Sequence, residues 1–115
     1  MKTNYNHQKG QKLIVNEKAR FHQIDIERIS HISCDGYLSI IYILDEKENI
    51  SVSHLLKDFE GDLSDMGFFR VNRNTLINLS HVDSYQNNGK PIVKMLNNKE
   101  FIISRRRLSA FLKII

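Results

Sequence analysis

The sequence predicts a mainly β domain with antiparallel strands and two short helices. Short runs rich in β-branched and aromatic side chains recur along the chain, and turn signals built from Gly, Asn or charged residues separate them. Only two stretches place apolar residues at helical spacing. The 115 residues, with 41% hydrophobic and 26% charged content, suit one globular domain.

The first half of the chain predicts strands joined in hairpins. The strongest strand signal is the run Tyr-Leu-Ser-Ile-Ile-Tyr-Ile-Leu, which follows a turn at Asp35 and Gly36. In chain order we expect strands at 12–15 and 19–24 around a turn at 16–17, one helical turn at 25–28, an irregular strand at 29–33, a strand at 37–44, a charged hairpin tip at 45–49 and its partner strand at 50–52.

The second half predicts both helices and a second hairpin. Ser53 is expected to cap a short helix in which Leu55, Leu56 and Phe59 share one buried face. Residues 68–78 enclose polar side chains between apolar ones without a strand or helix period, so we expect a loop held rigidly against the core. The remaining elements are strands at 82–85, 91–96 and 101–103, a hairpin turn at 87–90, and a last helix that Ser104 caps and whose apolar side carries Leu108, Phe111, Leu112 and Ile115.

The composition excludes several classes of protein. No apolar run approaches membrane-spanning length, and the polar first residues do not form a secretory signal. Cys34 is the only cysteine, which rules out a disulfide within the chain and fits the reducing cytoplasm. We therefore expect a cytoplasmic protein with a flexible lead-in at residues 1–11 and one domain at 12–115.

The sequence contains no recognisable enzymatic motif. Its five histidines are scattered without the spacing of a metal-binding pair. Cys34 lies beside Asp35, whose negative charge disfavours a thiolate nucleophile. There is neither a glycine-rich phosphate loop nor a Gly-x-Ser-x-Gly elbow. We therefore expect no enzymatic activity, no cofactor and no bound metal ion.

Positive charge is concentrated in the C-terminal quarter. Residues 90–115 hold seven Lys and Arg against one acid, Glu100, so this part carries +6 while the first 89 residues sum to −2. Such a distribution indicates an oriented anionic partner, either a nucleic acid or the acidic face of a protein. A solvated, lysine-rich surface without a partner is the alternative.

The stretch at 68–78 contains the first group of candidate binding residues. Arg and Asn side chains can each make paired hydrogen bonds to guanine and adenine edges. Arg70 follows two apolar aromatics and is expected to be a structural ion-pair partner, whereas Arg73, flanked by asparagines, is the better candidate for base or phosphate contact. Asn74 and Asn78 are alternatively turn-closing residues.

Two further groups flank that stretch. Arg105, Arg106 and Arg107 stand at the start of the last helix, where positive charge opposes the helix dipole. A phosphate-binding or groove-entering element would use arginines and free N–H groups there, although one or two of these arginines could instead pair with acids on a neighbouring element. Tyr37 and Ser39 are expected to be polar donors on one face at the rim of the strongest strand.

These residues together resemble the LytTR DNA-binding domain, the output domain of LytR/AgrA-type response regulators in two-component systems. Two motifs carry the resemblance, Phe-Phe-Arg-Val-Asn-Arg-Asn-Thr-Leu-Ile-Asn-Leu at 68–79 and Ile-Ser-Arg-Arg-Arg-Leu at 103–108. They follow the turn at 35–36 and the first helix in the order of the family, so the resemblance covers residues 12–115.

The resemblance implies an elongated fold of small stacked antiparallel sheets. It also implies a transcription regulator that holds double-stranded DNA in the major groove by loops and by the start of the C-terminal helix, typically across direct repeats. The DNA-binding residues carried over by position are Tyr37, Ser39, Asn72, Arg73, Asn74, Arg105, Arg106 and Arg107, with Arg106 favoured for base contact. Asn72 stands where the family often has His, and Thr75 stands where an aromatic residue is common.

The resemblance also bears on regulation and partners. Family members usually carry a receiver domain upstream, and these 115 residues hold none. We therefore expect control by a protein partner or by expression level, or by a histidine-kinase pathway if the domain is part of a longer chain. Direct repeats would place two copies on DNA as a dimer.

Two other binding functions are compatible with the sequence. The first is a protein-interaction module that docks on an acidic partner through the same basic face, and it would form a complex that DNA does not displace. The second is RNA binding, for which the sequence lacks the aromatic stacking platform that single strands require.

Overall fold

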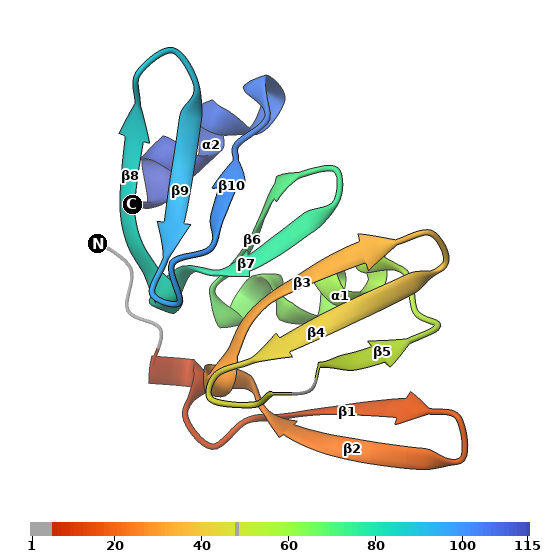
Figure 1. Ribbon diagram of the computed structural model, residues 1–115. Helices are drawn as coiled ribbons and strands as arrows, with labels where there is room; N and C mark the ends of the chain where they lie inside the picture. Colours follow the sequence, from red (N-terminus) through yellow and green to blue (C-terminus); the bar gives the residue numbers. More distant parts are fainter. Residues whose placement is uncertain (1–5, 48) are drawn as a thin grey trace.

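The computed structural model describes residues 6–47 and 49–115, and within them the chain forms three small antiparallel sheets and two α-helices (Figure 1). The strands are β1 (Lys12–Glu17), β2 (Arg20–Asp25), β3 (Ile29–Asp35), β4 (Leu38–Ile43), β5 (Ile50–Val52), β6 (Phe68–Asn72), β7 (Thr75–Asn78), β8 (Val82–Asn87), β9 (Pro91–Met95) and β10 (Glu100–Ile102). The helices are α1 (Leu56–Leu63) and α2 (Arg105–Ile114), and single 3-10 turns lie at Asn6–Gln8, Ile26–Arg28, Ser64–Met66 and Leu79–His81.

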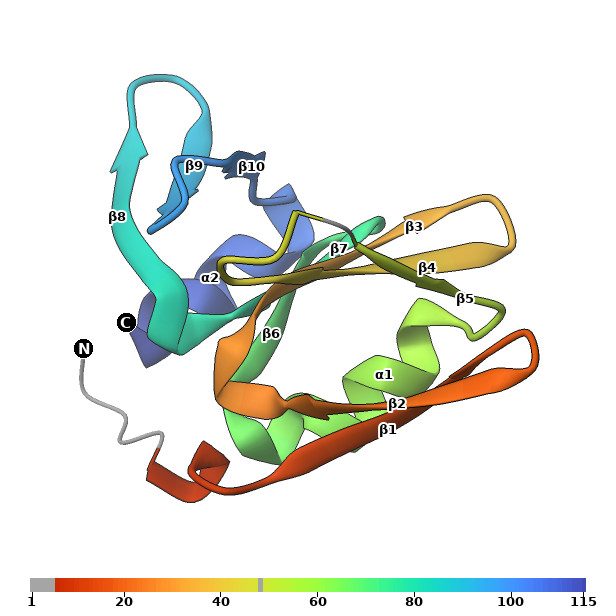
Figure 2. The same ribbon diagram turned by 60° about the horizontal axis from the view of Figure 1, so that its bottom comes forward.

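A five-stranded sheet with the order β5-β4-β3-β7-β6 forms the middle of the molecule. The β1–β2 hairpin lies on one side of it and the β10-β9-β8 sheet lies on the other (Figures 1 and 2). The molecule measures 45 × 31 × 26 Å, so it is elongated. The predicted fold class, a mainly β arrangement of small stacked antiparallel sheets with two short helices, is confirmed.

The central sheet separates two hydrophobic clusters. The first lies among the β1–β2 hairpin, the central sheet and α1, and contains the buried Ile32 and Phe59. The second lies under α2, and contains the buried Val93 and Phe111. Burying apolar surface on both faces is what holds such a thin sheet in place, since each face contributes about 25 cal/mol per Å² removed from water.

Residues 68–78 form a β-hairpin, so the expected loop is wrong. β6 and β7 pair antiparallel around a two-residue turn, and the register shifts between Arg70 and Asn72. All four residues of β7 are buried, because Leu76 packs into the first cluster and Ile77 into the second. A strand covered on both faces has no alternation of polar and apolar residues, which is why the strand period is missing from the sequence.

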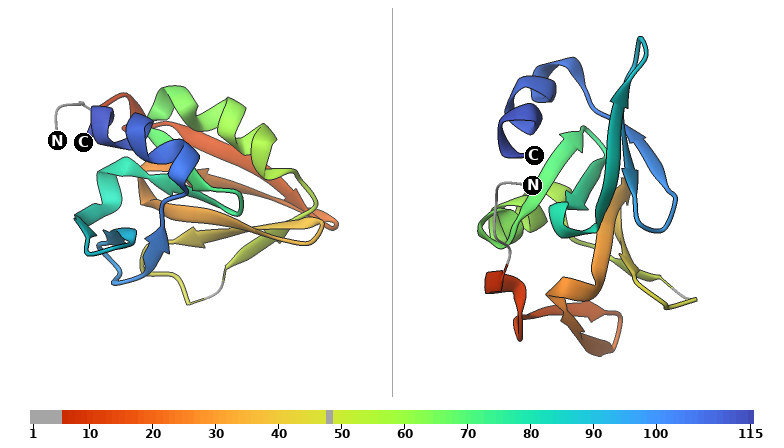
Figure 3. Two further views of the ribbon diagram at one scale, coloured as in Figure 1. Left: turned by 90° about the horizontal axis from the view of Figure 1, so that it is seen from above. Right: turned by 90° about the vertical axis from the view of Figure 1, so that its left-hand side faces the viewer.

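β6 is an edge strand of the central sheet, and the helices meet around it. The backbone N–H of Ser104 donates to the Val71 carbonyl at 2.8 Å, which fastens the start of α2 to the outer edge of β6. Figure 3 shows α1 and α2 on the same side of the molecule, and a hydrogen bond from Arg107 of α2 to Glu60 of α1 connects the two helices. The edge is therefore covered, as exposed strand edges in stable proteins usually are.

Three local predictions differ from the structure. The β1–β2 turn lies at Lys18, which has a positive φ of 56°, and not at residues 16–17. Helix α1 begins at Leu56 without a side-chain cap, so Ser53 is not its N-cap. Leu55, expected to be buried, is 57% exposed because the buried face of α1 runs through residues 56, 59 and 63. The helical turn after β2 and the hairpin turn after β8 are confirmed.

The lead-in is attached to the domain as far as the structure describes it. Gln8 is 2% exposed, and its Nε2 donates to the Met66 carbonyl at 2.5 Å and to Asn78 Oδ1 at 2.9 Å. The expected flexibility of residues 1–5 lies outside the described residues. Among the helices of the described chain, none has the length and apolar character needed to cross a membrane.

Candidate nucleic-acid interface

Three segments that lie far apart in the sequence form one surface. The β3–β4 turn and the β6–β7 turn point to the same side of the molecule, and the start of α2 lies above them (Figure 1). A cleft of about 250 Å³ has Tyr37 and Arg73 in its lining, and a second cleft of about 380 Å³ is lined by Arg70, Arg73, Ser104, Arg106 and Arg107. Arg70 and Arg73 line both clefts, so the two adjoin each other, and together they are called the groove.

The β3–β4 turn presents Tyr37. Gly36 has a φ of +63°, a conformation that glycine adopts without strain, and the turn leaves Tyr37 91% exposed. Ser39 does not share this position. It is 1% exposed, and its hydroxyl donates to the His54 carbonyl at 2.5 Å, so the expected rim of two polar donors is reduced to Tyr37.

The β6–β7 turn is held by its two asparagines. The side-chain amide of Asn72 donates to the Ile102 carbonyl at 2.8 Å, and its Oδ1 accepts from the backbone N–H of Asn74 at 2.9 Å. The backbone carbonyl of Asn74 accepts from the N–H of Cys34 at 3.0 Å, and its Oδ1 accepts from the Cys34 thiol at 3.3 Å. Both side chains therefore connect the turn to neighbouring strands.

Arg73 stands at the tip of this turn and is exposed. Its backbone carbonyl accepts a hydrogen bond of 2.5 Å from Arg70, but its guanidinium has no ion pair in the part of the chain that the structure describes. Arg70 also donates to Glu60 at 3.2 Å, which confirms its expected role as a structural ion-pair partner.

The three arginines at the start of α2 have different surroundings. Arg107 donates to Glu60 Oε2 and to the Arg70 carbonyl, both at 3.3 Å, which confirms for this one arginine the alternative of pairing with an acid on a neighbouring element. Arg105 and Arg106 are exposed, and no acid of residues 6–47 or 49–115 pairs with them. The first turn of α2 contains no acidic residue and no side-chain cap, so the positive end of its dipole is uncompensated.

The two departures from the family pattern occupy structural positions. Asn72 makes the hydrogen bonds that hold the turn, and Thr75 is buried at the first position of β7. A bulky aromatic side chain at residue 75 would have to be accommodated in this packed position. Among the predicted DNA-binding residues, the exposed ones are Tyr37, Arg73, Asn74, Arg105 and Arg106.

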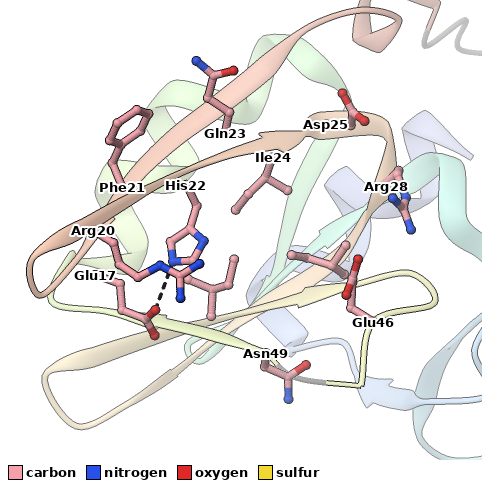
Figure 4. Close-up of a pocket in the computed structure, with 12 residues that line it drawn as sticks. Glu17, Arg20, Phe21, His22, Gln23, Ile24, Asp25, Arg28, Glu46 and Asn49 are labelled. Carbon is pink, nitrogen blue, oxygen red and sulfur yellow. Dashed lines mark hydrogen bonds and ion pairs between the residues drawn. The ribbon is translucent and has the colours of Figure 1, made fainter.

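A larger cleft of about 530 Å³ lies elsewhere, between β2 and the segment that joins β4 to β5 (Figure 4). His22 Nε2 lies 3.0 Å from Glu17 Oε1, and this hydrogen bond holds the pKa of the Glu17 carboxyl below its usual range. Acids and bases are mixed in the lining, and none of its residues lines the groove beside Arg73. This cleft lacks the excess of positive charge that a polyanion requires.

Comparisons with known proteins agree with the geometry. The chain matches the model of the LytTr DNA-binding domain over residues 19–115. The structure is similar to the solved LytTr DNA-binding domain of a Bacillus cereus protein described as a methyl-accepting/DNA response regulator, with a TM-score of 0.74, 15% sequence identity, and coverage of 89% of this chain and 94% of that one. No curated protein sequence is significantly similar to the chain. Since the family model covers most of its length, the chain belongs to the LytTR DNA-binding domain family, which provides response regulators with their DNA-binding domains.

Proposed function

We propose that this domain is a sequence-specific transcription regulator that contacts the major groove through the β3–β4 turn, the β6–β7 turn and the start of α2. The proposal depends mainly on one observation, that Arg73 lines two adjoining clefts. One cleft reaches Tyr37 on the β3–β4 turn and the other reaches Arg106 at the start of α2, so all three segments border the same basic groove. A two-stranded ribbon fits the major groove, which is about 12 Å wide.

The arginines of this groove divide into two kinds. Arg70 and Arg107 are committed to Glu60, so their charge is partly neutralised within the protein. Arg73, Arg105 and Arg106 keep their donors free for DNA within the described structure, where none of them forms an ion pair. We assign base contact to Arg73 and Arg106 because a planar guanidinium can make two parallel hydrogen bonds to guanine.

The remaining site residues take supporting roles in this proposal. Tyr37 contributes an exposed hydroxyl and ring at the edge of the groove, while Asn72 and Asn74 keep Arg73 in place. Arg105 supplies positive charge to a phosphate at the helix start, where N–H groups and the dipole also favour an anion. Two copies of the domain would occupy direct repeats.

Selection of genomic fragments by the purified domain tests the proposal. Wild type is compared with Arg106→Ala and with Arg20→Ala, a matched control that removes an exposed arginine lining the other cleft. We expect wild type and the control to enrich the same sequences, and Arg106→Ala to lose preference at one base position. If wild type retards no fragment at low salt, the proposal is wrong, and a complex with an acidic protein that DNA does not displace would establish the alternative.

A further inference from the structure

The carboxylate of Glu60 lies between two guanidinium groups that come from different elements. Its Oε1 is 3.2 Å from Arg70 Nη1 on β6, and its Oε2 is 3.3 Å from Arg107 Nη1 on α2. Glu60 itself belongs to α1, and its side chain is 33% exposed. One side chain therefore connects α1 to both elements that carry the basic groove.

Each arginine continues the connection to a backbone carbonyl. Arg70 Nη2 donates to the carbonyl of Arg73 at 2.5 Å, and Arg107 Nη1 donates to the carbonyl of Arg70 at 3.3 Å. The network thus runs from Glu60 to the tip of the β6–β7 turn in one direction and to the first turn of α2 in the other. Both ends carry arginines whose side chains lie in the groove.

Other acids on α1 do not take part in this network. Asp58 and Asp62 are exposed, and neither carboxylate forms an ion pair with a residue that the structure describes. All three acids belong to the same helix, so they contribute similar long-range repulsion to a bound polyanion. Only Glu60 can act through a fixed geometry.

We infer that Glu60 is a positioning residue that sets the sequence specificity of the groove, by fixing the Arg73 turn relative to Arg105 and Arg106. This inference rests on the proposed function. Base contacts need donors held within a fraction of an ångström, whereas attraction to phosphates depends mainly on charge. Loosening the network therefore affects recognition of the correct bases more than general binding to DNA.

The direction in which DNA affinity changes distinguishes a positioning role of Glu60 from a purely electrostatic one. An acid near a polyanion repels it, so neutralising Glu60 for electrostatic reasons alone would raise affinity for every DNA sequence. If Glu60 positions the arginines, neutralising it should instead lower affinity for the DNA sequence that wild type selects. Removing a negative charge makes the protein more positive, so a change in net charge cannot explain weaker binding to the selected sequence.

The experiment measures affinity for the sequence that wild type selects and for a scrambled duplex of the same length and base composition. Glu60→Gln keeps the shape and removes the charge, and Asp62→Asn is the matched control on the same helix. We expect the ratio of specific to non-specific affinity to fall about tenfold in Glu60→Gln, the size expected for losing a partly exposed charged hydrogen bond. We expect no change of this ratio in Asp62→Asn.

Glu60→Asp provides the second variant, with thermal unfolding as a check on folding. It keeps the charge but is one methylene shorter, so it cannot reach both guanidinium groups. We expect a smaller decrease in the ratio of specific to non-specific affinity than in Glu60→Gln. An unchanged ratio in folded Glu60→Gln or Glu60→Asp overturns the inference and leaves the proposed function intact. If wild type itself does not distinguish the two duplexes, the proposed function fails.

Discussion

Arg106 and Arg107 are neighbours in the sequence, and the structure predicts opposite consequences for their replacement by alanine. Arg107 donates to Glu60 and to the Arg70 carbonyl, whereas Arg106 has no such partner among the described residues. Arg107→Ala should therefore lower the free energy of unfolding, and Arg106→Ala should leave it unchanged.

The magnitudes follow from the surroundings of each side chain. Arg107 is 32% exposed, so solvent weakens its ion pair, and we expect Arg107→Ala to cost about 1 kcal/mol of stability. An exposed side chain without partners changes stability by less than about 0.5 kcal/mol. For DNA binding, Arg106→Ala should lose about 1–3 kcal/mol, because a two-pronged base contact is removed.

Urea unfolding followed by circular dichroism measures the first quantity, since the chain has no Trp to report by fluorescence. Fluorescence anisotropy with the selected DNA sequence measures the second. Equal loss of stability in the two variants would contradict the assignment of Arg107 as the bonded arginine and Arg106 as the free one. Full DNA affinity in Arg106→Ala would contradict its role in base contact.

Three more predictions concern other residues. Arg73→Ala should weaken binding to DNA and reduce the slope of log K against log salt by about one, measured by titrations at several salt concentrations. Ser39→Ala should cost about 1 kcal/mol of stability without reducing DNA affinity in anisotropy titrations, because the buried hydroxyl donates to the His54 carbonyl inside the domain. Burial, followed by the charges of Lys99 and His81, lowers the pKa of His31 from 6.5 to about 4, so the unfolded chain binds its proton first as the pH falls. The free energy of unfolding should therefore be highest above pH 6.5 and decrease by about 3 kcal/mol towards pH 4. Urea unfolding across this pH range measures it, and the decrease should be smaller in His31→Phe.

The strand content, the two helices and the basic C-terminal quarter could be predicted from the sequence, because each depends on local side-chain chemistry. β4 and the β8–β9 hairpin carry β-branched residues and turn signals within a few residues of one another. The hairpin at 68–78 could not be recognised by its period. Its second strand is buried on both faces, and this burial depends on clusters contributed by distant segments.

The candidate site was predicted as a set of residues, but their roles depend on contacts. Ser39, Asn72 and Arg107 have the side chains of DNA-binding residues, yet each is hydrogen-bonded within the protein. Glu60 was not singled out in the sequence, because a helical glutamate of this kind usually faces solvent. Its importance follows from the approach of Arg70 and Arg107, which are 37 positions apart.

The sequence by itself determined the fold class, the family and the residue types available for holding DNA. Strand patterns, motif order and charge depend only on which residues follow one another along the chain. The tertiary structure alone decided which arginines form ion pairs within the described residues. Arg70, Arg73, Arg106 and Arg107 have the same ionisable group, and their distances from the Glu60 carboxylate separate Arg70 and Arg107, which pair with it, from the two that we propose contact DNA. Ion pairing acts over a few ångströms, so it depends on spatial neighbours and not on sequence neighbours.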